Sequence, residues 1–410
     1  MKRPFVISIL ALLVLAGCNH NYQRGIEAYQ QGNYPAALSD LQTAAEAGNP
    51  DAQFKLADMH AKGLGTAKND ALAAQWYEQA AEQGVATAQL ELAGIYETGR
   101  GVAADDALAA KWYEKAAAQG NAPAQLKTAT NYAEGRGVKS NDAAAAKWYR
   151  RAAKQGIVEA QIKLADAYLA GRGVAENPKL AARWYRGAGN SGGAEAQLKL
   201  ARLYATGRGV TKNEITATDW YRKAADQGVA EAQFRIGYRY AEGIGVRQSD
   251  GEARKWYRKA AELGLPEAQY NLGVLTVRDP ALKNGRNFSE ARKWWHRAAT
   301  SGNAEAQNAL GVTYFKGIGA EQNHPAALRW FTLAADQGFS EAQINLAGMY
   351  ENGHGTGKDR IEAYKWYVVA AAGGLGKAFA NRDRMAQYMT KAQKREGQRL
   401  ARNWLAANAG

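Results

Sequence analysis

The sequence predicts an all-α fold, an α-solenoid of about nine helix-turn-helix repeats with capping helices at its ends. The dipeptide Ala-Gln recurs every 36 residues with one step of 38, and a tryptophan follows each glutamine at the same interval. Composition agrees, because alanine and leucine are abundant and there are only eight prolines. Units repeated at a fixed interval stack into one continuous core rather than closing separate domains. The glutamines are Gln53, Gln89, Gln125, Gln161, Gln197, Gln233, Gln269, Gln307 and Gln343.

The first eighteen residues, MKRPFVISILALLVLAGC, have the pattern of a secretory signal. Lys2 and Arg3 precede an apolar run that is shorter than the roughly 20 residues of a membrane-spanning helix. Cys18 is the only cysteine, and a single thiol in a secreted chain indicates a thiol that is chemically used.

The segment Leu15-Ala16-Gly17-Cys18 resembles the lipobox of bacterial lipoproteins. That resemblance implies that residues 1–17 are a removed signal peptide, that Cys18 carries acyl chains such as palmitate, and that residues 18–21 form a short tether. Several acyl chains hold a protein stably at a membrane. Asn19 resembles the enterobacterial sorting signal for the outer membrane, facing the periplasm, with the lipid as the only membrane contact. The alternative is a generic signal peptide with an incidental cysteine.

One unit shows why each repeat is a helical hairpin. Asn49-Pro50-Asp51 predicts a helix start, with a capping side chain, a proline in the first turn and a carboxylate near the positive helix end. Ala52, Leu56 and His60 then share one helical face, and Gly63-Leu64-Gly65 ends the helix.

A second helix follows in the same unit. Asn69-Asp70 predicts its start, and Gly84 predicts its end. Between them a broad apolar stripe recurs at helical spacing. A lone hairpin could not bury this stripe, so the units must stack on one another. The stripe consists of Ala73, Trp76, Tyr77, Ala80 and Ala81.

These residues match a known pattern, Ala-Gln-x-x-Leu-Ala-x-x-Tyr-x-x-Gly-x-Gly-Val followed by Ala-x-x-Trp-Tyr-x-x-Ala-Ala-x-x-Gly. Gln89–Val102 and Ala109–Gly120 carry it closely. The pattern resembles Sel1-like repeats, relatives of the tetratricopeptide repeat. The resemblance implies a right-handed superhelix of antiparallel helix pairs used for protein–protein interaction. It predicts a tetratricopeptide-like N-terminal cap over residues 22–50, Sel1-like repeats over 51–374 and C-terminal capping helices over 375–410.

The residue two positions after each glutamine is basic in several repeats. This position lies opposite the apolar stripe and faces solvent. In tetratricopeptide-like superhelices the first helix lines the concave surface, so the resemblance implies a basic ladder with rungs on the order of 10 Å apart. The alternative is a solvated face without a partner. The candidate partner-binding residues are Lys55, Lys127, Lys163, Lys199 and Arg235.

A second basic run lies two positions after the tryptophans and is expected on the convex or edge surface, where it serves solubility. It consists of Arg150, Arg186, Arg222 and Arg258. The formal net charge is +14, and about +12 (51 basic against 39 acidic) without residues 1–17. Such a charge attracts anionic partners. No nucleic-acid recognition motif accompanies it, so we expect no nucleic acid.

We predict no catalytic residue, no cofactor and no metal. The five histidines lack metal-ligand spacing, and no nucleophile motif is present. The Gly-x-Gly turns follow helices rather than strands, so their expected role is to end the first helix. The stretch between Gln269 and Trp294 lacks this turn and has two extra residues, which predicts a loop insertion, a kink or a partner-contacting loop.

Three functions follow from these patterns. The first is a monomeric envelope scaffold that binds another envelope protein in its groove and assists assembly of an export or envelope complex. The second is a binding scaffold for an acidic polysaccharide or peptidoglycan. The third is a cell-wall hydrolase, for which the sequence places no acid/base pair.

Overall fold

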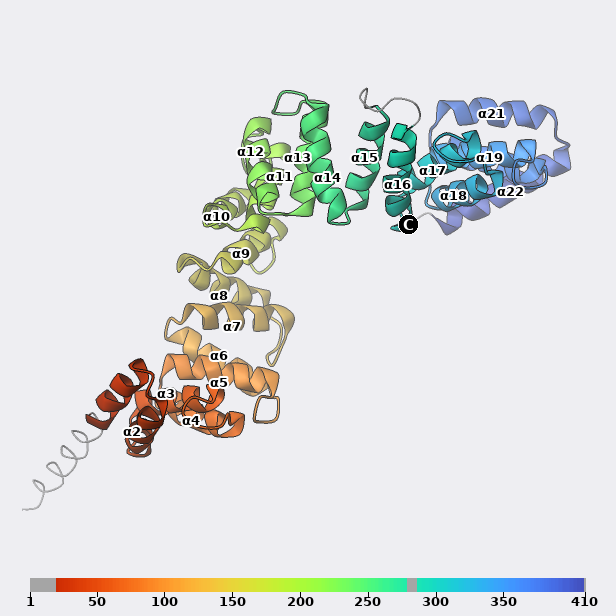
Figure 1. Ribbon diagram of the computed structural model, residues 1–410. Helices are drawn as coiled ribbons and strands as arrows, with labels where there is room; N and C mark the ends of the chain where they lie inside the picture. The colour runs from red at the N-terminus through yellow and green to blue at the C-terminus, as the bar shows by residue number, and fades with distance from the viewer. Residues whose placement is uncertain (1–19, 279–285, 409–410) are drawn as a thin grey trace, which may run out of the picture. The chain divides into compact units, whose positions relative to one another are not determined.

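The computed structural model describes residues 20–278 and 286–408, and all regular structure within these ranges is helical, as predicted (Figure 1). Contacts within the chain define two units, Met1–Lys212 and Asn213–Gly410, which are described separately. The first unit contains a helical segment over residues 20–30 and then α2 (Tyr34–Glu46), α3 (Pro50–Lys62), α4 (Asp70–Glu82), α5 (Ala86–Thr98), α6 (Asp106–Ala118), α7 (Ala122–Glu134), α8 (Asp142–Lys154), α9 (Val158–Ala170), α10 (Pro178–Asn190) and α11 (Ala194–Thr206).

The second unit continues the alternation of first and second helices. It contains α12 (Glu214–Asp226), α13 (Ala230–Glu242), α14 (Asp250–Glu262), α15 (Pro266–Val277), α16 (Arg286–Thr300), α17 (Ala304–Lys316), α18 (His324–Asp336), α19 (Ser340–Asn352), α20 (Arg360–Ala372), α21 (Gly376–Gln387) and α22 (Lys391–Ala407). Within the first unit from α2 to α11, and within the second from α12 to α21, each helix packs against the next in the chain, which is the arrangement of an α-solenoid.

The helix ends lie where capping chemistry predicts them. The Asn49 side chain accepts a hydrogen bond from the Ala52 N–H at 2.9 Å, and Asn69 accepts one from the Leu72 N–H at 3.0 Å. Gly63 ends α3 in the left-handed conformation, with φ of 70°. The expected hairpin is therefore confirmed at each of these ends.

The core of each hairpin pairs small with large side chains. Ala52 and Leu56 of α3 are fully buried, and His60 on the same face is 9% exposed. Burial lowers the pKa of His60, because a charged imidazole is poorly solvated there. Tyr77 from the second helix is 2% exposed, so the predicted stripes do meet in the interior.

The periodic glutamine has a structural role that the sequence alone did not reveal. Gln89 is 4% exposed, and its Nε2 donates to the carbonyl oxygen of Ala81 at the end of the preceding second helix, at 3.0 Å. Its Oε1 accepts from Gln119 Nε2, thirty residues later, at 2.8 Å. One buried amide thus joins the ends of two successive second helices. The Nε2 contact recurs from Gln53, Gln125, Gln161, Gln197, Gln233, Gln269, Gln307 and Gln343.

The two glycines of each Gly-x-Gly turn have different roles. Gly99 ends α5 with φ of 69°, as expected. Gly101 lies against the start of the preceding second helix, where a Cβ atom would come within 2.5 Å of the Asp70 carbonyl oxygen. The second glycine therefore permits close packing between consecutive repeats.

α15 ends differently from the other first helices. It stops at Val277, and its C-cap is Arg278 in the right-handed conformation rather than a left-handed glycine. The predicted insertion begins there, and its residues 279–285 lie outside the described ranges.

The chain closes with α21 and α22, both of which pack against α20. Thr390 starts α22 with a reciprocal capping box. Met385 and Met389 are buried, and Trp404 meets Trp366 edge-on with ring centroids 5.6 Å apart. Across the described residues, every helix is too short or too polar to cross a bilayer.

Candidate functional site

The predicted basic residues lie on successive first helices, two residues after the buried glutamines. We call the solvent-facing side of α3, α5, α7, α9 and α11 the first-helix face. Lys55, Lys127, Lys163 and Lys199 belong to it, and Arg235 lies on α13 of the second unit. Their role in binding a partner stays a prediction, but their surroundings differ in ways that the sequence did not reveal.

Lys127 is held by a carboxylate of the preceding repeat. Its Nζ lies 2.9 Å from Glu97 Oε2, and Arg136 approaches the other oxygen at 3.2 Å. The hydroxyl of Tyr113 donates to Glu97 Oε2 at 2.6 Å. Burial alone would raise the pKa of Glu97, but the hydrogen bonds from Tyr113 and Lys127 and the nearby cations hold it below its ordinary value. We call this arrangement the Glu97 clamp.

A similar clamp surrounds Asp166. The hydroxyl of Tyr185 donates to this carboxylate, and Lys199 Nζ lies 2.8 Å from it and 2.8 Å from Glu195. Burial would lower the pKa of Lys199, yet its hydrogen bonds to both carboxylates raise the pKa above its usual value. The Lys199 side chain is only 25% exposed, so little of its charge faces a ligand.

The remaining predicted residues are also partly engaged. Lys55 Nζ lies 4.5 Å from the centre of the Tyr29 ring, a cation–π distance. Arg235 Nε lies 3.5 Å from Glu231 on the same helix. The predicted basic residues therefore do not form a uniform row of available cations, because most of them contact acidic or aromatic groups of this chain.

Lys163 is the exception. It is exposed, and no ion pair to it occurs among the described residues. It borders a cavity of about 210 Å³ on the first-helix face. The cavity is lined by Ala133, Glu134, Asp142, Ala145, Ala146, Tyr149, Lys163, Asp166, Ala167 and Arg172.

The second basic run connects consecutive repeats. Arg150 donates to the Tyr168 hydroxyl at 2.8 Å, and Arg186 donates to the Tyr204 hydroxyl at 2.6 Å. Each arginine thus bridges a second helix to the first helix of the next repeat. The solubility role expected from the sequence is accompanied by a packing role.

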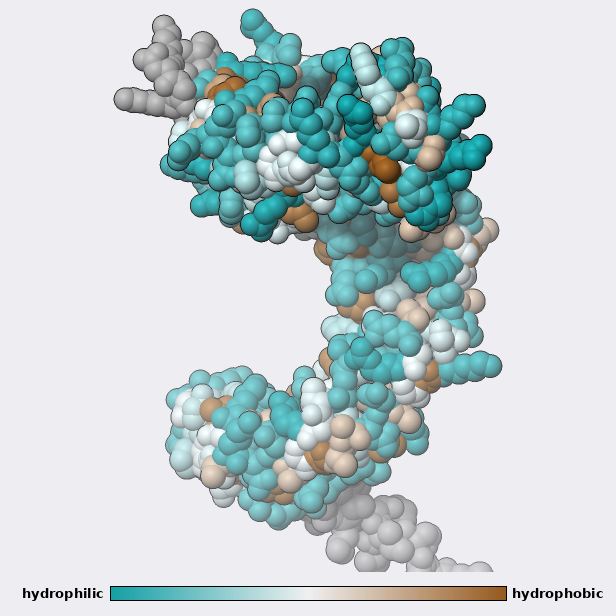
Figure 2. Space-filling model, turned by 90° about the vertical axis from the view of Figure 1, so that its right-hand side faces the viewer, coloured by the Kyte–Doolittle hydropathy of each residue, from teal (hydrophilic) through white to brown (hydrophobic). Residues whose placement is uncertain are grey.

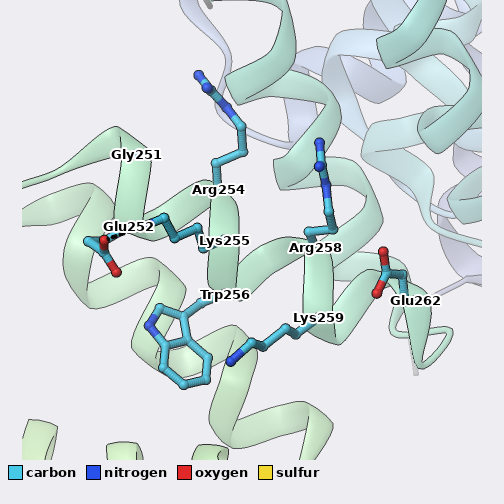
Figure 3. Close-up of a pocket in the computed structure, with 8 residues that line it drawn as sticks. All are labelled: Gly251, Glu252, Arg254, Lys255, Trp256, Arg258, Lys259 and Glu262. Atoms are coloured by element: carbon cyan, nitrogen blue, oxygen red, sulfur yellow. Dashed lines mark hydrogen bonds and ion pairs between the residues drawn. The ribbon is translucent and has the colours of Figure 1, made fainter.

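A third set of cations covers the tryptophan rings. Lys115 Nζ lies 3.9 Å from the ring centre of Trp112, and Lys259 Nζ lies 4.0 Å from that of Trp256. Figure 3 shows Lys259 beside Trp256 on α14, whereas Arg254 and Arg258 extend away from the ring. These residues border a shallow cavity of about 580 Å³. Its lining side chains come from α14, which indicates an open helix surface rather than an enclosed site.

Among the described residues, no group of three histidine, cysteine, aspartate or glutamate side chains is arranged to hold a metal ion. His324 and His354 stack with ring centroids 4.8 Å apart, and Phe315 packs against both. This cluster is aromatic packing beside a cavity of about 340 Å³ on α17 and α19.

The surface does not present one broad apolar patch on the side shown in Figure 2, where hydrophilic residues predominate and apolar ones are scattered. The most exposed large apolar side chains are Ile215, Tyr238, Leu263, Leu333, Phe379 and Tyr388. Polar contacts on the first-helix face are therefore the best-organised surface feature.

Comparison with known proteins agrees with this architecture. The family pattern described as Sel1 repeat matches residues 50–85, 86–121, 122–157, 158–192, 194–229, 230–265, 266–303, 304–339 and 340–375. A protective antigen of uropathogenic Escherichia coli strains, which displays an SLR fold, is 29% identical with a TM-score of 0.63, over 98% of this chain and 95% of that one. A Sel1 repeat protein from Oxalobacter formigenes is 29% identical with a TM-score of 0.61, over 76% and 89%. No curated protein matches the chain.

Proposed function

The chain belongs to the Sel1 repeat family, and from that premise we propose that it is a non-catalytic scaffold of the bacterial envelope that binds another protein on its first-helix face. A Sel1 solenoid suggests protein–protein interaction in general. The single observation that supports the specific face is the pair of clamps around Glu97 and Asp166, two repeats apart, in each of which a tyrosine, a carboxylate and a cation are held together. Such pre-ordered polar groups recognise a partner with little loss of side-chain entropy.

The envelope location is the second part of this proposal, and the lipobox-like sequence ending at Cys18 supports it. Cys18 lies outside the described residues. Acylation there would place the solenoid at a membrane surface without a spanning helix. We propose the outer membrane, facing the periplasm, and a contribution to the assembly of an export or envelope complex.

The acidic-polymer alternative has less support. A polymer with a charge on every unit needs an unbroken row of available cations. Lys127 and Lys199 are instead neutralised by Glu97 and Asp166. A protein partner, which can place a few charges at chosen positions, suits this surface better.

Site-specific photo-crosslinking in intact cells tests the scaffold. A photoreactive amino acid at position 159, an exposed site on α9, samples the first-helix face and leaves Lys163 in place, and one at position 147, an exposed site on α8, serves as the matched control. We expect one dominant crosslinked protein from position 159 and little from position 147, identified by mass spectrometry. Equal yields of many proteins from both positions would contradict a specific partner on this face.

A further inference from the structure

The Glu97 clamp shows how this chain holds a carboxylate. Three donors converge on Glu97: the hydroxyl of Tyr113 at 2.6 Å, Nζ of Lys127 at 2.9 Å and the Arg136 guanidinium at 3.2 Å. The tyrosine comes from the second helix of the same repeat, and both cations come from the next repeat. Charge-assisted hydrogen bonds of this kind are the strong ones in proteins.

The same three donors occur one repeat later, without their carboxylate. Tyr149, Lys163 and Arg172 lie 36 residues after the donors of the Glu97 clamp, and Ala133 lies 36 residues after Glu97. All four of these residues line the cavity of about 210 Å³. Within the part of the chain that the structure describes, the Tyr149 hydroxyl has only a long contact of 3.4 Å, to the Thr130 hydroxyl. The cavity therefore lies where a glutamate side chain lies in the preceding repeat.

The repeat that contains Gln161 has a carboxylate of its own, five positions after the glutamine. This carboxylate, Asp166, accepts from Tyr185 and pairs with Lys199. The repeat of Gln125, which lies between those of Glu97 and Asp166, has Thr130 at this position and Ala133 three residues later. Of these three consecutive repeats, the middle one therefore keeps the donors but has neither carboxylate.

Three acidic residues also border the cavity, and two already have cationic partners. Glu134 pairs with Arg136 at 2.7 Å, and Asp166 pairs with Lys199. Asp142 lies in the first turn of α8, where the positive helix end stabilises a carboxylate. Because these acidic side chains repel negative charge, a ligand with several negative charges should bind poorly. A single carboxylate on an otherwise uncharged segment is favoured over a polyanion.

We propose that the cavity beside Ala133 binds the carboxylate of one acidic side chain of a partner protein, through Tyr149, Lys163 and Arg172. The inference rests on the proposed scaffold function and specifies the chemistry that its partner brings. Glutamate is the side chain that the equivalent donors hold in this chain. The partner's carboxylate takes the place that Glu97 takes in the preceding repeat.

The test uses the mature chain with ¹³C-labelled tyrosine rings, and the Tyr149 signal is assigned with Tyr149→Phe. The probe is N-acetylglutamate amide, and N-acetylglutamine amide is its uncharged counterpart. We expect the Tyr149 signal to shift with the glutamate compound and not with the glutamine compound. Lys163→Gln should weaken binding about tenfold, the effect of losing one charge-assisted hydrogen bond, whereas Lys147→Gln, at an exposed position of α8, should leave it unchanged.

Ala133→Glu provides an internal test that needs no added ligand. A tethered carboxylate should raise the thermal midpoint relative to Ala133→Gln and abolish the response to the glutamate compound. Three results would each overturn the site: equal responses to both compounds, equal loss of binding in Lys147→Gln and Lys163→Gln, or a lower midpoint in Ala133→Glu than in Ala133→Gln. A stronger response to galacturonate than to the glutamate compound would overturn the choice of a protein ligand.

The same variants separate this inference from the scaffold proposal. If Ala133→Glu still yields the crosslinked partner from position 159 and the glutamate compound does not shift the Tyr149 signal of the wild-type chain, the site is wrong and the scaffold remains. If no partner is recovered from any variant, the scaffold proposal fails, and with it the assignment of the carboxylate to a partner protein.

Discussion

Single residues decide whether neighbouring repeats stay together, and the buried glutamine is the clearest case. Gln125 Nε2 donates to the Ala117 carbonyl at 3.2 Å, and its Oε1 accepts from Gln155 at 2.9 Å. The sequence marks this residue by its interval. It could not reveal the bonding, because the main acceptor is a backbone carbonyl, which no residue type identifies.

Gln125→Leu should lower the free energy of unfolding by roughly 1–3 kcal/mol, because it leaves the buried Ala117 carbonyl without this donor and removes one of the two hydrogen bonds of the Gln155 amide, which keeps its bond to Gly120. Urea denaturation followed by circular dichroism measures the change. Lys147→Gln, at an exposed position of α8, is the control and should change stability by less than about 0.5 kcal/mol. Equal effects of the two substitutions would contradict the role of the buried amide.

Glycines at φ near 70–90° differ in what surrounds them. A Cβ on Gly137 would overlap the carbonyl oxygen of Asp106, whereas one on Gly156 meets no atom within 4 Å. Gly156→Ala should therefore cost only the backbone strain, about 1–2 kcal/mol. Gly137→Ala should cost about 1–3 kcal/mol more, because the two repeats must separate. Thermal unfolding of both variants decides between this account and one in which all turn glycines are equivalent.

The sequence could not predict the two clamps, and the physical reason differs from the one given for the buried glutamine. The carboxylate comes from position eight after the glutamine at Glu97 and from position five at Asp166. Because these positions are about one helical turn apart, each carboxylate reaches the tyrosine at the equivalent position of its own repeat, Tyr113 or Tyr185. Neither carboxylate position is acidic in every repeat. The sequence predicted that Lys163 and Lys199 both face solvent. Lys163 is exposed, but Lys199 is half-buried against Asp166, and only the structure distinguishes the unpaired lysine from the paired one.

Helices are the level at which the sequence was most informative. The starts of α3 and α4 follow from Asn49 and Asn69, since capping is local chemistry. The end of α15 at Val277 was less predictable, because no glycine marks it. Pro280 predicts a stop near this point, because a proline disfavours the helical conformation of the residue before it, but it does not fix the last helical residue.

At the scale of helices, we predict that acid weakens the packing of α19 against α20 and α21. Glu351 of α19 accepts from Tyr367 of α20 and Arg384 of α21, both at 2.8 Å. The Arg384 hydrogen bonds hold the pKa of Glu351 below its ordinary value, despite burial. A lowered carboxyl pKa in the folded state gives stability that is present above about pH 4.3 and is lost as the pH falls through the folded-state pKa.

The thermal midpoint of the wild-type chain should therefore fall more steeply between about pH 5 and 3 than that of Glu351→Gln. Differential scanning calorimetry across this range measures both. At pH 7 Glu351→Gln should be the less stable of the two, and the difference should shrink on acidification. A constant difference at all values of pH would show that Glu351 does not lose its ion pair there.

At the scale of the molecule, a stack of equivalent hairpins should tolerate changes of whole repeats. Deletion of residues 86–121 removes one matched repeat and restores the junction with residue 122 in the same phase. We expect a helical, cooperatively unfolding chain with a lower midpoint, because one interface is lost. Deletion of α5 alone should leave an unmatched apolar stripe and cause aggregation, measured by light scattering. Comparable solubility of both deletions would contradict nearest-neighbour stacking.

The glutamine amides do not form an unbroken series. Oε1 of Gln161, Gln233 and Gln269 accepts no hydrogen bond from the described residues. Thirty residues after Gln161 and Gln233 stand Ser191 and Leu263, where Gln83 and Gln119 occupy the equivalent positions earlier in the chain. When the solenoid is stretched along its axis, the contacts between repeats at these three glutamines should break first. A protein tethered at one end and held by a partner elsewhere would then lengthen in steps at sites determined by its own side chains.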